Sequence, residues 1–259
     1  MVALNILRIG TLTLDFMKYL GNISLFAANI LYCCFRPPFY FKQFFKELYK
    51  IGFLSLPVVG LTAVFTGMVL ALQSYTGFSR FSAENSIATV VVLSITRELG
   101  PVLASLMVAG RVGAAMAAEI GTMRVTEQID ALITLSTNPM KYLVVPKVLA
   151  SIISLPLLVI CADAIGVLGG YLISVHKLKF NGALYLEQTF KYLEAHDVNS
   201  GLVKAAVFGF IISLFGCYQG YKSKGGAQGV GFATTNAVVL ASITILISDY
   251  ILTALLFAK

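Results

Sequence analysis

A run of the chain without any formal charge limits the possible folds more than any other feature of the sequence. From Ile51 to Ser79 no Lys, Arg, Asp or Glu occurs, and about 20 apolar residues are enough for a helix to cross the hydrocarbon core of a bilayer. Further apolar segments follow, and 58% of the chain is hydrophobic while only 12% is charged. A water-soluble domain of this length could not bury that much apolar surface. The sequence therefore predicts an all-α membrane protein.

Five spanning helices are predicted, separated by short polar or glycine-rich segments. We place them at about residues 51–76, 87–118, 142–175, 202–221 and 231–257, and together they form a domain over residues 51–259. The mixed-charge stretch between the third and fourth helices is long enough for a small surface helix.

The first 50 residues are interpreted as a separate region at the membrane surface. Residues 1–34 are apolar, but Arg8, Asp15 and Lys18 share one helical face, which favours a helix lying in the interface. After a break at the prolines that follow Arg36, a basic aromatic segment to Lys50 suits the headgroup layer.

A short amphipathic helix is predicted outside the bilayer, between the second and third spans. Thr126 is expected to cap it, Glu127 and Asp130 lie in its first turn, and Asn138-Pro139 ends it. Its apolar face is formed by Val125, Ile129, Leu132 and Ile133.

The basic residues indicate the orientation of the chain. With the N-terminus in the cytoplasm, eleven Lys and Arg fall inside and five outside, as the positive-inside rule requires. The inner set is Arg8, Lys18, Arg36, Lys42, Lys46, Lys50, Arg124, Lys141, Lys147, Lys222 and Lys224, and the outer set is Arg80, Lys177, Lys179, Lys191 and Lys259. The amphipathic helix is then cytoplasmic and the C-terminus lies on the opposite side.

Four charged residues fall within the predicted spans, in the outer half of the membrane: Arg97, Glu98, Lys204 and Asp249. A charge in hydrocarbon costs at least about 2.5 kcal/mol, so these side chains should pair or line a polar cavity. We predict that they share one region, with Lys204 neutralised by Glu98 or Asp249. A structural ion network and direct contact with a substrate are equally good interpretations of this pattern.

Several function classes are disfavoured by the residues. The basic side chains form no continuous stripe for nucleic acid. The cysteines and histidines lack metal-ligand spacing, and the glycines after Lys224 lack the Gly-Lys-Ser/Thr of a phosphate loop. We expect no metal site, no catalytic residue and no cofactor in this chain.

Three motifs in order carry a resemblance to a known family: RELGPVL, AGRVGAAMAAEIGTMRVTEQIDAL, and NPMKYLVVPKVLA. Together with LVKAAVFGF and SDYILTALLF near the C-terminus, they resemble the MlaE/YrbE permeases of ABC transporters that move phospholipids between the inner and outer membranes. The resemblance implies a homodimer with a lipid cavity, a separate ATPase that binds ATP and Mg²⁺, an MCE-domain protein on the periplasmic face and a STAS-domain protein on the ATPase.

The resemblance also implies roles for particular residues. Glu127, Asp130 and Leu132 would lie in the helix that couples to the ATPase, and the four intramembrane charges would adjoin the cavity. Leu70, Leu72 and Tyr75 are suggested as its apolar lining. The absence of a recognisable transit peptide favours the bacterial inner membrane over a plastid envelope.

Two other classes were weighed against this interpretation. An ion-coupled secondary transporter of an amphipathic substrate would also bury charges, but it would usually show matching repeats, and the five spans show none. An intramembrane enzyme ranks last because the spans contain no His and no paired aspartates.

Overall fold

All regular structure in the computed structural model is helical across the residues it describes, 2–79 and 86–257, of which 2–12 and Phe16 are described by backbone alone. Five stretches of the described chain are long and apolar enough to cross a membrane, so the predicted fold class is confirmed. These stretches are Phe41–Phe78, Ile87–Val125, Met140–His176, Ala195–Tyr221 and Gly226–Leu256. The predicted outer-loop residue Arg80 and the terminal Lys259 lie outside the described residues.

Local irregularities divide the five stretches into shorter elements. One further helix precedes the stretches and two lie between them. In chain order these are α1 (Val2–Cys34), α2 (Phe41–Ile51), η1 (Phe53–Ser55), α3 (Leu56–Phe78), α4 (Ile87–Ser94), η4 (Ile95–Leu99), α5 (Gly100–Val108), η5 (Ala109–Gly113), α6 (Ala114–Val125), α7 (Gln128–Thr134), η6 (Met140–Val144), α8 (Val145–His176), α9 (Gly182–Tyr192), α10 (Ala195–Tyr221) and α11 (Gly226–Leu256). Here η1 is a 3₁₀ turn and η4, η5 and η6 are π-turns.

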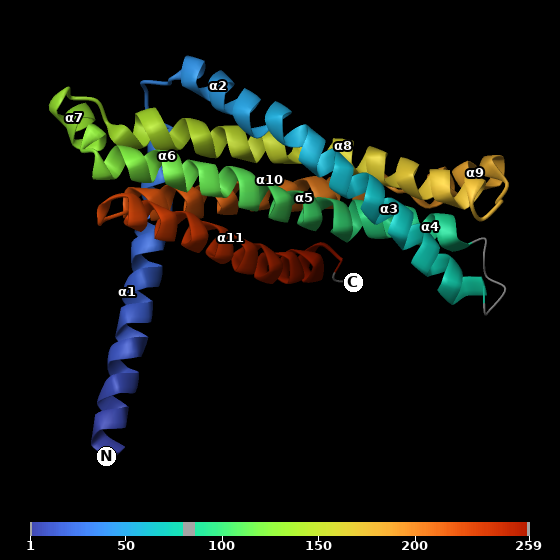
Figure 1. Ribbon diagram of the computed structural model, residues 1–259, viewed down its shortest axis with the longest axis horizontal. Coiled ribbons are helices and arrows are strands. Elements are labelled where there is room, and N and C mark those ends of the chain that lie inside the picture. Colours follow the sequence, from blue (N-terminus) through green and yellow to red (C-terminus); the bar gives the residue numbers. More distant parts are fainter. Residues whose placement is uncertain (1, 80–85, 258–259) are drawn as a thin grey trace.

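The long helices run side by side, with α7 at one end of the bundle and α9 at the other (Figure 1). Helix α8 packs against α3, α2 and α10, and α10 packs in turn against α6, α11 and α5. The hydrophobic core accordingly follows α8 and α10, where Leu155, Phe208 and Cys217 are completely buried. Helix α11 buries only a narrow stripe, formed by three alanines and Ile245, and leaves much of its remaining surface open.

Helix α1 leaves the bundle and runs across its long direction (Figure 1). Among the described side chains of α1, those of its C-terminal part pack on the bundle, where Ile30 is buried and Phe26 contacts the rings of Tyr218 and Tyr221. A helix along the membrane surface would take this direction beside a membrane-crossing bundle, and the placement of α1 there stays a prediction. The predicted shared face of α1 includes Arg8, whose side chain lies outside the described residues.

Close helix packing depends on glycine at several crossings. A Cβ atom on Gly67 of α3 would collide with the carbonyl oxygen of Gly166 on α8, and a Cβ on Gly209 of α10 would lie 2.5 Å from the carbonyl oxygen of Ser151. Any larger residue would therefore push these helices apart.

Several helix ends differ from the prediction because capping and packing, rather than hydropathy, decide them. The helix of the second span does not end near residue 118 but continues to Val125. The helix of the fourth span begins at Ala195 instead of 202, because Glu194 and Asp197 form a reciprocal capping box at its start. In the first span the break in the helix lies just before Pro57, at η1. The small surface helix predicted after the third span is confirmed as α9, capped by Asn181.

The amphipathic helix is shorter than predicted, and its predicted caps are wrong. It covers only Gln128–Thr134, and its N-cap is Glu127 in a left-handed conformation with φ of 59°. Thr126 caps nothing, because its hydroxyl donates back to the carbonyl of Thr122 at 2.8 Å. Asn138 does not end this helix; its side chain instead accepts from the backbone N–H of Met140 at the start of the next one.

Candidate functional site

A π-turn in the second span organises the intramembrane charges. Residue Pro101 has no backbone N–H, so the carbonyl oxygen of Arg97, four residues earlier, loses its normal helical donor. The helix widens here into η4, in which the N–H of Gly100 bonds to the carbonyl of Ile95. The free carbonyl of Arg97 accepts a hydrogen bond from Lys204 Nζ at 3.0 Å.

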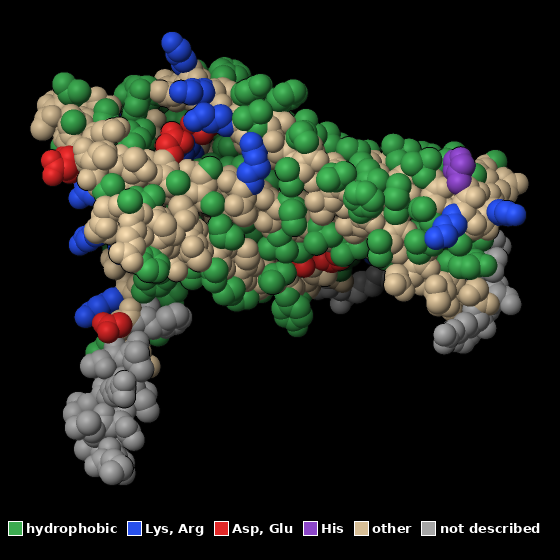
Figure 2. Space-filling model, in the orientation of Figure 1, with side chains coloured by type: hydrophobic (Ala, Val, Ile, Leu, Met, Phe, Trp, Pro, Cys, Tyr) green, Lys and Arg blue, Asp and Glu red, His purple; other side chains and the backbone are tan. Residues whose placement is uncertain are grey.

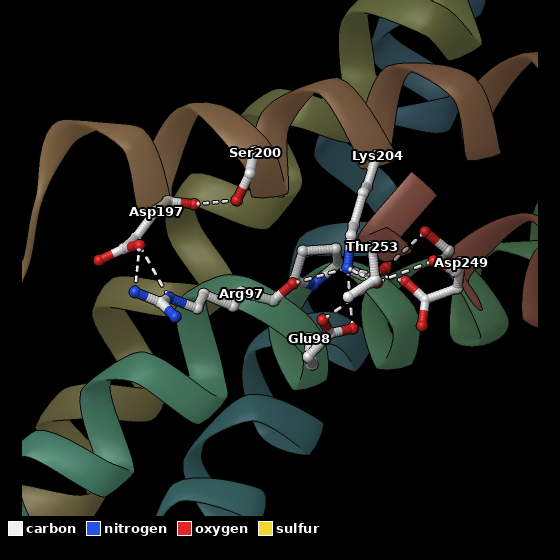
Figure 3. Close-up of polar contacts among 9 residues, drawn as sticks. Arg97, Glu98, Asp197, Ser200, Lys204, Asp249 and Thr253 are labelled. Atoms are coloured by element: carbon white, nitrogen blue, oxygen red, sulfur yellow. Dashed lines mark hydrogen bonds and ion pairs between the residues drawn. The ribbon is translucent and has the colours of Figure 1, made fainter. Parts of the chain in front are cut away.

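Lys204 lies at the centre of the resulting charge cluster (Figure 3). Its ammonium group donates to Glu98 Oε2 at 2.8 Å and to Thr253 Oγ1 at 2.7 Å, in addition to the Arg97 carbonyl. Asp249 Oδ1 lies 3.0 Å from the same nitrogen. Because an ammonium has three N–H groups and all are directed to other acceptors, Asp249 contributes an ion pair rather than a fourth hydrogen bond. Both predicted partners of Lys204 thus contact it.

The side chain of Arg97 does not join this cluster but pairs with a residue that sequence reasoning missed. Its guanidinium forms a 2.7 Å ion pair with Asp197 and lies over the ring of Phe257. Asp197 is buried and also caps the start of α10. It belongs to the mixed-charge stretch after the third predicted span, although it precedes Lys204 by seven residues and therefore shares its helical face. Consecutive residues of η4 thus bind two positions on one face of α10 (Figure 3).

The cluster lies toward the end of the bundle that carries α9. At 1.5 Å per residue, Lys204 is about 14 Å from the start of α10 and Asp249 about 11 Å from the end of α11. The Lys204 side chain is 0% exposed, whereas Glu98 is 38% and Asp249 19% exposed, and Arg97 is 36% exposed. The carboxylates and the guanidinium therefore reach the surface of the single chain, while the ammonium does not.

A second charge cluster, which the sequence analysis did not find, joins three helices near the α7 end. Lys147 of α8 lies 3.0 Å from Glu47 of α2 and 2.9 Å from Glu119 of α6. Lys50 forms two longer ion pairs, with its Nζ 3.6 Å from a carboxylate oxygen of Glu47 and 3.7 Å from one of Glu119. The Lys147 side chain, predicted on the cytoplasmic side of the membrane, is only 3% exposed and lies inside the bundle. The one sequence feature that could have indicated this second cluster is Lys147 itself, a single lysine about one turn inside an apolar run.

The suggested apolar lining is not brought next to Lys204 within one chain. Leu70 and Tyr75 pack against a small separate core that includes Ile87 and Val91, and Tyr75 contacts the ring of Phe180. Leu72 lies on the same helix, α3, which packs on α8, α4 and α5 and has no extensive contact with α10 or α11. Its role in a cavity stays a prediction.

The predicted coupling residues lie at the end of the bundle, on and beside α7 (Figure 1). Glu127 is exposed, and Asp130 forms a 2.8 Å ion pair with Arg124 of α6. Leu132 is half-buried, and the helix is held to the bundle mainly by the fully buried Ile129. The carboxylates therefore face outward while one apolar residue anchors the helix.

Comparison with known proteins agrees with this architecture. The family model Permease MlaE matches residues 44–255. A probable ABC transporter permease protein of Rickettsia bellii is 64% identical over 249 residues, covering 96% of both chains. The intermembrane phospholipid transport system permease protein MlaE of Haemophilus influenzae is 36% identical over 252 residues, again covering 96% of both. The chloroplastic protein TRIGALACTOSYLDIACYLGLYCEROL 1 of Arabidopsis thaliana is 36% identical over 238 residues, which is 91% of this chain and 67% of that one. The bacterial relatives are named as transport permeases rather than enzymes, and this integral membrane protein belongs to the MlaE permease family.

Proposed function

We propose that this chain is the membrane-embedded permease subunit of an ABC transporter that moves phospholipids between the inner and outer membranes of a bacterium. It would reside in the inner membrane with its N-terminus in the cytoplasm and its C-terminus in the periplasm, and act as a homodimer. A separate ATPase would supply the energy, with an MCE-domain protein at the periplasmic face and a STAS-domain protein on the ATPase. The family relationship and the printed name of the Haemophilus relative support the substrate class.

The single observation that carries the proposal is a set of charged groups that reach the bundle surface at membrane depth. Arg97 and Glu98 are neighbours of opposite charge, 36% and 38% exposed. A zwitterionic headgroup carries the same two charges in one molecule, so a phosphate can approach Arg97 while an ammonium approaches Glu98. Lys204 is fully buried. Its part is therefore to hold the carboxylates in place rather than to touch the headgroup.

The α7 end of the bundle supplies the second element that a driven transporter needs, a contact for the ATPase. Helix α7 follows α6 directly, and α6 packs on both α10 and α11, which carry Lys204 and Asp249. A displacement of α7 can therefore be passed through α6 to the helices that hold the charge cluster.

The experiment replaces Glu127 by Lys and measures both retention of the ATPase on purification and ATP-dependent transfer of labelled phospholipid from proteoliposomes. Glu127 is a better position for this test than Asp130, because replacing Asp130 by Lys would also break its ion pair with Arg124. We expect normal membrane insertion with loss of ATPase retention and of transfer. The matched control, Glu187→Lys, reverses an exposed carboxylate on α9 at the opposite end and should change neither. Normal ATPase yield and normal transfer in Glu127→Lys would refute the coupling assignment.

A further inference from the structure

An apolar groove runs along the seam between α2 and α8, away from the Lys204 cluster. It consists of two crevices of about 200 Å³ and 370 Å³. Phe41 and Ile153 line the first, and Phe45 and Leu157 line the second. Because the two residues on each helix are one turn apart, the crevices follow one another along the same side of the seam. We call them together the α2–α8 groove.

The shape of the groove suits a long flexible chain. Its lining on α8 extends from Val145 to Cys161, about 24 Å at 1.5 Å per residue. This exceeds the ~15 Å of hydrocarbon in one leaflet. The side chains of Phe45, Phe53 and Leu157 along it are more than half exposed, so the groove opens to the surface that meets lipid.

One end of the groove is basic. Lys141 lines the first crevice, and its Nζ donates to the carbonyl of Pro37 at 2.7 Å. Lys42 is exposed and follows Phe41, which lines the same crevice. Lys46, one turn further along α2, is also exposed but lies close enough to Glu119 to interact with its carboxylate. Figure 2 shows Lys and Arg side chains gathered over the start of α2 and the α7 end, with hydrophobic side chains dominating the middle of the bundle. A ligand with a negative head and an apolar tail matches this distribution.

A buried hydroxyl in the groove lacks a partner. Ser154 lines the second crevice, is 1% exposed, and its Oγ has no hydrogen-bond partner in the described structure. The neighbouring Ser151 instead donates to the carbonyl of Lys147 at 2.8 Å. Ser154 lies 13 residues beyond Lys141, roughly 20 Å along the helix, so it borders the acyl-chain part of the groove rather than the ester groups beside a headgroup at Lys141.

We propose that the α2–α8 groove binds one anionic phospholipid, with its headgroup at Lys42 and Lys141 and its acyl chain along α8 past Ser154. This site is separate from the cluster around Lys204, and it does not depend on the proposed transport function. The bound lipid would brace α2 against α8 beside the Lys147 ion pairs.

Native mass spectrometry of the detergent-purified protein, with added phosphatidylglycerol or phosphatidylcholine, tests the site. We expect one phosphatidylglycerol to be retained in preference to phosphatidylcholine. The double variant Lys42→Gln/Lys141→Gln should weaken phosphatidylglycerol binding about 25-fold, from roughly fivefold per lysine, and abolish the preference. Leu157→Trp, which fills the open groove, should reduce the binding of both lipids.

The matched control removes two exposed lysines at the opposite end, Lys177→Gln/Lys191→Gln, and should leave binding unchanged. Equal retention of the two lipids by the unaltered protein would overturn the proposal. It would also be overturned if Arg97→Gln removed the bound lipid while Lys42→Gln/Lys141→Gln did not, because the lipid would then occupy the proposed transport site. If Leu157→Trp changed the number of copies of this chain in the particle but not lipid retention, the groove would be a protein contact instead.

Discussion

Replacing Lys204 by Met should destabilise the protein by about 3 kcal/mol. The ammonium is 0% exposed and faces two carboxylates, Glu98 and Asp249. Breaking a buried ion pair by removing one partner costs roughly 3–5 kcal/mol, because it leaves uncompensated charge behind. Here Glu98 is 38% exposed and Asp249 19% exposed, so both can regain some solvation in the variant. The expected loss therefore lies at the lower end of the range.

The measurement is the free energy of unfolding in mild detergent, determined by denaturant titration, together with ATP-dependent phospholipid transfer. The matched variant is the triple replacement Lys204→Met/Glu98→Gln/Asp249→Asn, which removes all three charges at nearly constant volume. Replacement of a whole buried ion network by neutral groups is often close to neutral for stability. We expect the triple variant to unfold within about 1 kcal/mol of the unaltered protein.

The two readouts separate a structural role from a role in transport. Restored stability with transfer still absent would mean that the carboxylates act on the substrate as well as on Lys204. Restored stability with restored transfer would make the cluster purely structural. An unaltered unfolding free energy in Lys204→Met alone would refute the argument that Lys204 compensates buried charge.

Three further substitutions test the packing and capping arguments. Gly67→Val should lower the unfolding free energy by about 3 kcal/mol, because a side chain collides with the backbone of Gly166; Gly67→Ala should do so by less, in the same denaturant titration. Asn181→Ala should lose about 1 kcal/mol with the cap of α9, seen as faster amide exchange confined to that helix. Asp197→Ala should cost about 3 kcal/mol, because it removes both the acceptor of a charged hydrogen bond from Arg97 and the half of the capping box of α10 that accepts from the Glu194 backbone N–H. Amide exchange should rise at the start of α10, and unchanged exchange there would contradict the capping role.

The helical architecture was predictable because it depends on local sequence. The charge-free run from Ile51 identifies a spanning helix by hydropathy alone, and the charges of residues 177–198 identify a segment too polar for the membrane. The same reasoning explains the errors at helix ends. Hydropathy places the start of the fourth span at about residue 202, but the capping box of Glu194 and Asp197 begins the helix seven residues earlier.

The pairing of distant charges was only partly predictable. A charge within a span must find a partner. Because the predicted spans contain few acidic residues, this rule correctly paired Lys204 with Glu98 and Asp249. The same rule could not identify the partner of Arg97, because Asp197 had been assigned to a loop. Nor could it find the pairs of Lys147, since Glu47 lies in the basic aromatic segment predicted at the membrane surface and Glu119 lies just beyond the predicted end of the second span. In both cases a misplaced helix boundary removed the true partner from consideration.

The π-turn at η4 explains why helical periodicity could not predict the directions in which the Arg97 and Glu98 side chains point. A π-turn takes in one residue more than an α-turn, so α4 and α5 do not share one helical register across Ile95–Leu99. The sequence does contain the cause, since Pro101 withholds the donor that the carbonyl of Arg97 would otherwise receive. That carbonyl is then free for Lys204, while the side chain of Arg97 extends toward Asp197 and that of Glu98 toward Lys204 (Figure 3). One proline thus allows two adjacent residues of the second span to bind α10 at points seven residues apart, which ties the position of the exposed charges to the packing of the bundle.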